Sequence, residues 1–218
     1  MNIGILGGSG REGSGLAFRW ALAGHNVILG SRDTDKAAAC AAELNQLLEG
    51  KALVRGASNA DAAGAAVVVL TVPYAAQLAT AESVATQLAG KILIDVTVPL
   101  APPKVDRVQL PNGESAVLAL QRMLGDSVKV VSAFQNVSAT HLKNAAHEVD
   151  CDVLVCGDDA GAREVVIGLA QDAGLRAWHA GALANSIASE ALTSVLIAIN
   201  KRYKIAGSGI RITGVPAK

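Results

Sequence analysis

The sequence predicts an α/β protein built on a doubly wound parallel sheet. Short apolar runs rich in branched residues alternate with segments of helical periodicity along the whole chain. A glycine-rich turn joins the first apolar run to the first helical segment. Of the 218 residues, 51% are hydrophobic but only 3% are aromatic, so the core must be built mainly from aliphatic side chains.

The chain begins with a strand–turn–helix unit. Residues 2–6 form a short apolar run that is typical of a buried strand, and a helix is expected from about Ser14. Between them lies Gly8-x-Gly10-x-x-Gly13. In this geometry Gly8 permits a tight turn, Gly10 lets the main chain approach a diphosphate, and Gly13 lets the helix pack on the strand. The motif alone is weak evidence, but its place between strand and helix favours a Rossmann-type dinucleotide site.

The remaining elements are expected to alternate in order. Strands are predicted at residues 26–30, 52–56, 66–71, 91–95, 128–133, 152–156 and 176–180, and helices at 34–48, 58–65, 75–89, 114–124, 159–173 and 183–203. Four prolines between residues 99 and 111 mark a long loop. We expect residues 1–140 to form the dinucleotide-binding domain. We expect residues 141–218 to form a smaller C-terminal α/β domain that packs back on it.

The end of the second strand discriminates between cofactors. An acidic residue there binds the ribose hydroxyls of NAD, whereas this chain has Ser31-Arg32-Asp33. The guanidinium of Arg32 and the hydroxyl of Ser31 suit the 2′-phosphate of NADP, and Lys36 lies one helical turn further on. Two alternatives stay open. Arg32 and Lys36 could be surface charges paired with Asp33 and Asp35, or a one-residue shift could place Asp33 on the ribose.

Composition argues against several other classes. The net charge is zero and the charges are evenly spread, so no nucleic-acid partner is expected. No signal peptide is recognised, and no apolar stretch is expected to reach the ~20 residues that a membrane span needs. The three cysteines fit no metal site and suggest a reduced, cytoplasmic protein. The four histidines are scattered, so no metal is expected.

Several segments carry a family resemblance. They are residues 7–10, 30–32 with Lys36, 70–73, 130–134, 155–159, 180–185 and 206–214. On these segments the chain resembles the NADPH-dependent reductases of coenzyme F420, also called F420-dependent NADP oxidoreductases, over nearly its full length. The first two segments are shared by many NADP proteins, whereas the later ones are more specific.

The resemblance implies a reaction and a site. A hydride would pass directly between nicotinamide C4 and deazaflavin C5, with the two rings stacked in one cleft. The resemblance places NADP on Ser9, Gly10, Arg11, Glu12, Ser31, Arg32, Lys36, Val72, Pro73, Val98 and Ala139. It places coenzyme F420 beside Gln135, Asn136, Val137 and Ala139, with Asn185, Thr193, Gly209 and Ile210 as candidates on the other side.

Gln135 departs from the family pattern, because some members carry His there. Its amide is expected to hydrogen-bond a ring carbonyl but cannot carry a proton. Since the two cofactors carry the chemistry, no catalytic side-chain acid or base is expected.

Two other functions remain open from the sequence. One is an NADPH-dependent reductase of a flavin or of a small carbonyl or imine compound, in which Lys143 or His141 would have to supply a proton. The other is a non-catalytic NADP-binding sensor. The apolar segment 183–199 could pack across a dimer axis or cover the cofactor cleft, so the partners expected are small redox cofactors and a second copy of the chain.

Overall fold

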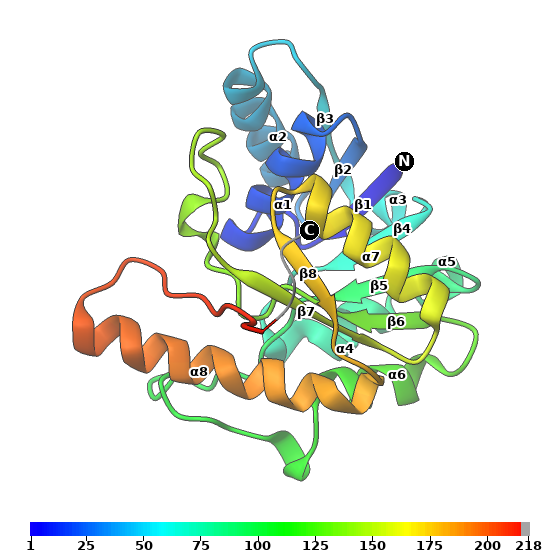
Figure 1. Ribbon diagram of the computed structural model, residues 1–218. Coiled ribbons are helices and arrows are strands. Elements are labelled where there is room, and N and C mark those ends of the chain that lie inside the picture. The colour runs from blue at the N-terminus through cyan, green and yellow to red at the C-terminus, as the bar shows by residue number, and fades with distance from the viewer. Residues whose placement is uncertain (215–218) are drawn as a thin grey trace.

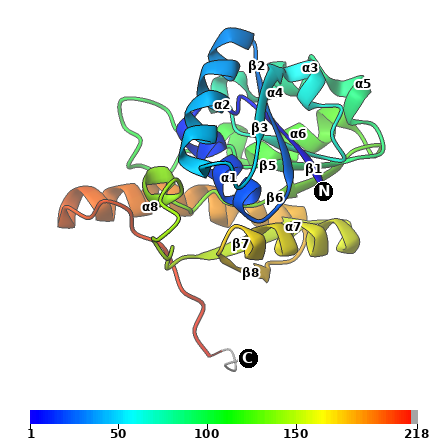
Figure 2. The same cartoon turned by 90° about the horizontal axis from the view of Figure 1, so that it is seen from above.

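The computed structural model describes residues 1–214 and has one eight-stranded sheet between two layers of helices (Figures 1 and 2). The strand order is β3-β2-β1-β4-β5-β6-β7-β8. The strands are β1 (Asn2–Leu6), β2 (Asn26–Ser31), β3 (Val54–Ser58), β4 (Val67–Leu70), β5 (Ile92–Asp95), β6 (Lys129–Ser132), β7 (Asp152–Gly157) and β8 (Arg176–His179). The expected α/β fold with a doubly wound, Rossmann-type sheet is confirmed.

Helices cover both faces of the sheet (Figure 2). Their bounds are α1 (Arg11–Leu22), α2 (Thr34–Leu48), α3 (Asn59–Ala62), α4 (Gln77–Glu82), α5 (Ala85–Leu88), α6 (Ala116–Leu124), α7 (Ala160–Asp172) and α8 (Ser186–Tyr203). One core cluster contains side chains of α1, α2 and α7, and a second contains side chains of α3 to α6. The strands supply aliphatic residues to both clusters, which explains their nearly continuous apolar sequences.

Two elements differ from the sequence prediction for local reasons. The third strand lies at 54–58 instead of 52–56, because the Asn45 side chain brackets Val54, accepting from its N–H at 2.7 Å and donating to its carbonyl at 2.9 Å. The helix predicted at 75–89 is divided into a 3₁₀ turn at Tyr74–Ala76, α4 and α5. The break lies at Ser83, whose hydroxyl donates to the carbonyl of Thr80 at 2.7 Å and so competes with helix continuation.

The sheet is not parallel throughout, and this corrects the prediction. Strand β7 pairs with β6 in the antiparallel direction, whereas β7 and β8 are parallel to each other. A parallel partner for β6 would need a crossover back to its amino end. Instead, the connection contains only the 3₁₀ turn Ala139–His141, which packs against α1, and the chain returns at the carboxyl end of β6.

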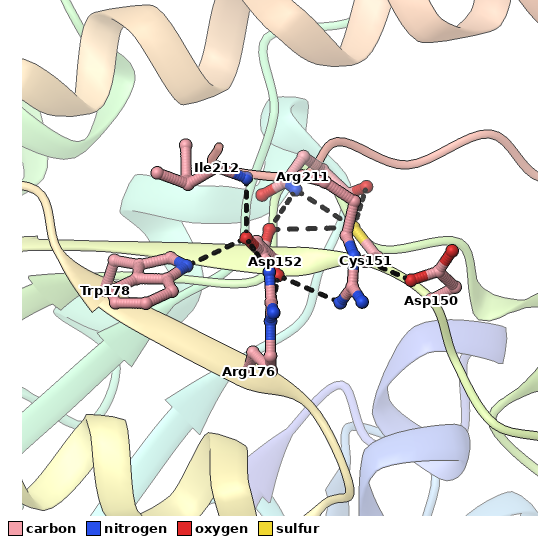
Figure 3. Close-up of polar contacts among 8 residues, drawn as sticks. Asp150, Cys151, Asp152, Arg176, Trp178, Arg211 and Ile212 are labelled. Atoms are coloured by element: carbon pink, nitrogen blue, oxygen red, sulfur yellow. Dashed lines mark hydrogen bonds and ion pairs between the residues drawn. The ribbon is translucent and has the colours of Figure 1, made fainter. Parts of the chain in front are cut away.

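A buried carboxylate ties the C-terminal segment to the end of this sheet (Figure 3). Asp152 is fully buried and accepts two hydrogen bonds from Arg176, at 2.8 and 2.9 Å, and one from the Trp178 indole at 2.8 Å. It also accepts from the main chain of Ile212 at 2.7 Å and lies 3.3 Å from the Arg211 guanidinium. These donors hold the pKa of Asp152 well below its usual range.

Helix α8 and the 3₁₀ turn before it form a 21-residue segment, Leu183–Tyr203. By length and composition alone this segment could cross a membrane, so the expectation that no apolar stretch reaches that length is wrong. Within its most apolar stretch of 18 residues, 33% is buried inside the protein. A single helix of this kind is weak evidence for a membrane span, because core helices of soluble proteins pass the same test.

Candidate active site

The glycine turn after β1 lies at the switch point of the sheet, where β1 has β2 on one side and β4 on the other. Gly7 has a φ of +69°, so the left-handed position that requires glycine is residue 7 and not Gly8 as predicted. A Cβ on Gly13 would lie 2.5 Å from Thr71 Oγ1 and 2.8 Å from Gly8 Cα, which supports the predicted close packing. Helix α1 begins at Arg11, earlier than predicted, so its free N–H groups lie directly behind the turn.

A first cavity of about 280 Å³ extends from this turn to the tip of β2. It is lined by Gly7, Ser9, Gly10, Ser31, Arg32, Lys36, Asn59, Thr71, Val72, Pro73, Ala76 and Thr80. Asn59 was not predicted from the sequence. Its side-chain oxygen accepts from the N–H of Gly7 at 3.3 Å, so the first residue of α3 steadies the glycine turn from the neighbouring connection.

The charges at the tip of β2 separate the alternatives left open by the sequence. Asp33 is the N-cap of α2, and its carboxylate accepts from the N–H of Lys36 at 3.1 Å. Ser31 accepts from the N–H of Asp33 at 3.1 Å. Within residues 1–214 neither Arg32 nor Lys36 forms an ion pair with a carboxylate. Two cations without acidic partners therefore line one small cavity, as an anionic group would require.

A second, larger cavity of about 750 Å³ lies along the carboxyl ends of β4, β5 and β6. It is lined by Gly10, Arg11, Glu12, Thr71, Val72, Pro73, Tyr74, Ala75, Val96, Thr97, Val98, Leu100, Pro102, Val105, Phe134, Gln135, Val137 and Thr193. Arg11 and Glu12 are its charged members, and most of the others are apolar. It shares Gly10, Thr71, Val72 and Pro73 with the smaller cavity, so the two spaces adjoin.

Glu12 lies in the first turn of α1 at the wall of the larger cavity. Its Oε1 atom is buried and has no hydrogen-bond partner among the described residues. Burial without a compensating partner disfavours the ionised carboxylate and raises the pKa of Glu12 to about 8. The protonated form of this side chain is therefore favoured more than in an ordinary surface glutamate.

A connected polar network supports another part of the cavity wall, which contains Gln135, Thr97 and Thr193. Thr193 of α8 donates its hydroxyl to the main-chain carbonyl of Gln135 at 2.7 Å, and the Gln135 amide donates to the carbonyl of Asp95 at 2.8 Å. Asp95 is fully buried, accepts from the N–H of Thr97 at 2.9 Å and contacts the Gln77 amide. Burial raises the pKa of Asp95. These bonds fix the tips of β5 and β6 relative to α8.

The connection from β6 to β7 is held by one guanidinium. Arg19 of α1 donates to the carbonyls of Leu142 at 2.7 Å, Asn144 at 2.8 Å and His147 at 2.8 Å. Burial lowers the pKa of Arg19. The same connection carries Asn136, whose amide donates to the carbonyl of Asp152 at 2.7 Å and so joins the cleft wall to β7.

Most of the predicted site residues line one or both cavities. The smaller contains Ser9, Gly10, Ser31, Arg32, Lys36, Val72 and Pro73, and the larger contains Gly10, Arg11, Glu12, Val72, Pro73, Val98, Gln135 and Val137, together with Thr193. Asn136 lines only a neighbouring cavity of about 120 Å³, and its amide donates to the carbonyl of Asp152. Ala139 lies in the 3₁₀ turn outside these three cavities, and Asn185 donates to the carbonyl of Ala180. Gly209 lies at another hollow, beside Cys151, and Ile210 pairs with the main chain of Asp152.

The histidines and acidic side chains form no metal cluster within the part of the chain that the structure describes. The rings of His141 and His147 stack on each other, with centroids 4.1 Å apart, beside a hollow of about 250 Å³. His141 does not line the larger cavity, which weakens it as a proton donor for a carbonyl substrate there.

Comparisons with known proteins agree with one another. A family profile described as "NADP oxidoreductase coenzyme F420-dependent" matches residues 2–99. F420-dependent NADP reductases of Methanothermobacter marburgensis and Methanocaldococcus jannaschii are each 42% identical to this chain. Each alignment covers 99% of this chain. It covers 100% of the M. marburgensis protein and 99% of the M. jannaschii protein. A crystal structure of a putative F420-dependent NADP reductase from Arthrobacter sp. FB24 superposes with a TM-score of 0.79 at 29% identity, covering 97% of this chain and 98% of that one.

Proposed function

This chain belongs to the family of coenzyme F420-dependent NADP oxidoreductases, and from that premise we propose how its two cavities hold the cofactors. It is an oxidoreductase that transfers a hydride between NADP(H) and the deazaflavin coenzyme F420. The observation that carries the proposed arrangement is the boundary of four residues shared by the two cavities. Because the two cavities adjoin, a dinucleotide with its adenosine end in the smaller one can reach toward the larger one.

NADP occupies the smaller cavity with its adenosine end. Its 2′-phosphate lies against Arg32, Ser31, Lys36 and Ser9, where two cations have no acidic partner among the described residues. The diphosphate lies at the amino end of α1, against the main chain of Gly10, Arg11 and Glu12. The nicotinamide ring then extends past Val72 and Pro73 toward Val98, in the larger cavity.

Coenzyme F420 occupies the rest of the larger cavity. Gln135, Val137 and Thr193 support this placement because they face the same space as Val98. Asn136 and Ala139 do not line the larger cavity and support its wall indirectly. The Asn136 amide donates to the carbonyl of Asp152 in β7. The sequence predicts that residues 1–140 bind NADP and that residues 141–218 complete the deazaflavin side of the cleft. Thr193 supports this prediction, because it belongs to the second range and lines the larger cavity.

The residues orient the cofactors and exclude water, and the bound pair supplies the hydride chemistry between nicotinamide C4 and deazaflavin C5. The apolar walls formed by Val72, Pro73, Val98 and Phe134 suit two flat rings lying face to face. The buried acceptor oxygens of Glu12 and Gln135 provide the few polar contacts that such a cavity needs to fix ring orientation.

A cavity-filling variant tests this arrangement. Val98→Trp should obstruct the part of the larger cavity beside residue 98 and strongly weaken binding of F420, while leaving the smaller cavity intact. Binding of adenosine 2′,5′-bisphosphate, which needs only the smaller cavity, should stay at the wild-type level. Unchanged F420 affinity in Val98→Trp would contradict the placement, and calorimetry with each ligand measures both results.

We further propose that the protein is a cytoplasmic homodimer with small-molecule redox cofactors as its ligands, acting without nucleic acid or a membrane. Cys40, Cys151 and Cys156 are free and buried, which supports a reducing compartment. Helix α8 supports the dimer, because Val195 on it is 44% exposed beside the half-buried Leu192 and Ile199. Analytical ultracentrifugation of the wild type and of Val195→Glu tests the assembly, and a monomeric wild type would refute it.

A further inference from the structure

The Gln135 side chain is buried and only half engaged. It is 4% exposed, and its amide nitrogen donates to the carbonyl of Asp95 at 2.8 Å. Because a main-chain carbonyl oxygen can only accept, this bond determines which way the amide faces. The nitrogen is directed to the protein, and the oxygen is the atom left over.

That oxygen, Oε1, is buried and has no hydrogen-bond partner among the described residues. Gln135 lines both the larger cavity and the neighbouring cavity of about 120 Å³. A buried acceptor without a donor is unfavourable, so a ligand that fills the cleft should supply an N–H or O–H group. The sequence predicted that this amide donates to a ring carbonyl. The structure instead leaves its oxygen available to accept from the ligand.

The neighbouring side-chain donors are already committed to the protein. The Thr193 hydroxyl donates to the carbonyl of Gln135 at 2.7 Å, and the Asn136 amide donates to the carbonyl of Asp152 at 2.7 Å. Neither Thr193 nor Asn136 therefore supplies a side-chain donor to Oε1. The N3–H group of a deazaflavin lies between two ring carbonyls, so a site built for it would place a donor on each side of the acceptor. The N1–H group, which exists only in the reduced ring, does not lie between two carbonyls.

We propose that Gln135 Oε1 accepts a hydrogen bond from N1–H of reduced coenzyme F420, so that the chain binds the reduced coenzyme more tightly than the oxidised one. This rests on the proposed placement of F420 in the larger cavity. In the oxidised ring N1 carries a lone pair, which would face the lone pairs of Oε1.

The balance of the reaction is unchanged by this role. NADPH transfers a hydride to C5 and becomes NADP⁺, and N1 gains a proton from solvent, so oxidised F420, NADPH and one proton yield reduced F420 and NADP⁺. Gln135 neither gives nor takes a proton, because its amide does not titrate. It is a positioning residue whose contact forms as the ring is reduced.

Isothermal titration of the intact protein with oxidised and with chemically reduced F420, under nitrogen, tests the proposal. The wild type should bind the reduced form roughly tenfold more tightly, as expected for one hydrogen bond to a buried acceptor. Gln135→Met, which keeps the length but removes the acceptor, should bring the ratio close to one by weakening the reduced complex. Gln135→His should retain part of the preference, because one ring nitrogen can donate to Asp95 while the other accepts.

Equal affinity of the wild type for both redox forms would overturn the proposal, whatever the variants do. It would also be overturned if Gln135→Met weakened both forms by the same factor, since the bonded N–H would then be one that both forms carry. Failure of the wild type to bind either form would instead refute the placement of F420 itself. Melting curves of each variant confirm that the comparison is made between folded proteins.

Discussion

Ser115 donates its hydroxyl to the carboxylate of Glu190 across 2.5 Å, in the buried contact between α6 and α8. The same carboxylate accepts from the N–H groups of Ala116 at 2.8 Å and Val117 at 3.2 Å. A side chain of one helix thus caps the amino end of another. Thr193 lies one turn beyond Glu190 on α8 and reaches the cleft, so this capping contact also sets the position of the cleft wall.

Replacing Glu190 should be strongly destabilising. Glu190→Ala removes three hydrogen bonds and leaves the Ala116 N–H buried without an acceptor, whereas the Val117 N–H and the Ser115 hydroxyl keep Ser115 Oγ and Ser186 Oγ as partners. We expect a loss of roughly 1–3 kcal/mol in the free energy of unfolding. Glu190→Gln, which retains one acceptor oxygen, should lose less. Urea denaturation followed by circular dichroism measures both. Similar stability of Glu190→Ala and the wild type would show that the contact contributes little.

Arg32 should decide between NADPH and NADH. Arg32→Ala removes a charge-assisted contact to the 2′-phosphate, so NADPH binding should weaken by roughly 1.5–3 kcal/mol while NADH binding stays the same. Arg55→Ala is a matched control, because Arg55 is exposed on the adjacent strand β3 and does not line either cavity. Calorimetric titration with each cofactor checks this. Equal losses for NADPH and NADH in Arg32→Ala would remove the basis for the phosphate site.

Glu12 should make the protein less stable as pH rises, which is opposite to the effect of a carboxyl group whose pKa is lowered on folding. Its folded-state pKa is raised to about 8, so the native state binds more protons than the unfolded state between the ordinary glutamate pKa and pH 8. Stability should therefore fall as pH rises through this window. Glu12→Gln should flatten that slope in denaturation curves recorded from pH 5 to 9. An unchanged slope in Glu12→Gln would assign the pH dependence to other groups.

Arg19 should control the mobility of the connection between β6 and β7. Arg19→Met keeps the aliphatic stem but removes the donors to four carbonyls, and we expect a loss of roughly 1.5–3 kcal/mol. Amide hydrogen exchange in residues 141–147 should become faster. Arg19→Lys, with its single ammonium group, should give an intermediate result. Exchange at the wild-type rate in Arg19→Met would show that other contacts hold this segment.

The sequence was most informative where local chemistry decides the structure. Alternating apolar runs and helical periodicity were enough for the fold class, and the helix predicted over 34–48 has its observed bounds, with Asp33 as its N-cap. Cavities at the carboxyl ends of the strands follow from topology, so Arg32 and Val72, which line one of them, could be named in advance as cavity residues.

Contacts between distant segments were not accessible in the same way. Asn59 holds the glycine turn from 52 residues away, and Arg19 holds carbonyls more than 120 residues away. Nothing in the local pattern around either residue indicates its partner. The reversal of β7 was missed for a similar reason, because strand patterns carry the alternation of faces but not the direction of the neighbour.

The most direct test of the shared cleft is isotope transfer with NADPH deuterated at the transferred position of C4. If both rings lie face to face in the larger cavity, the deuterium should reach C5 of reduced F420 without dilution in ordinary water, as mass spectrometry would detect. Loss of the label to solvent, with unlabelled reduced F420 as the product, would contradict direct transfer between stacked rings.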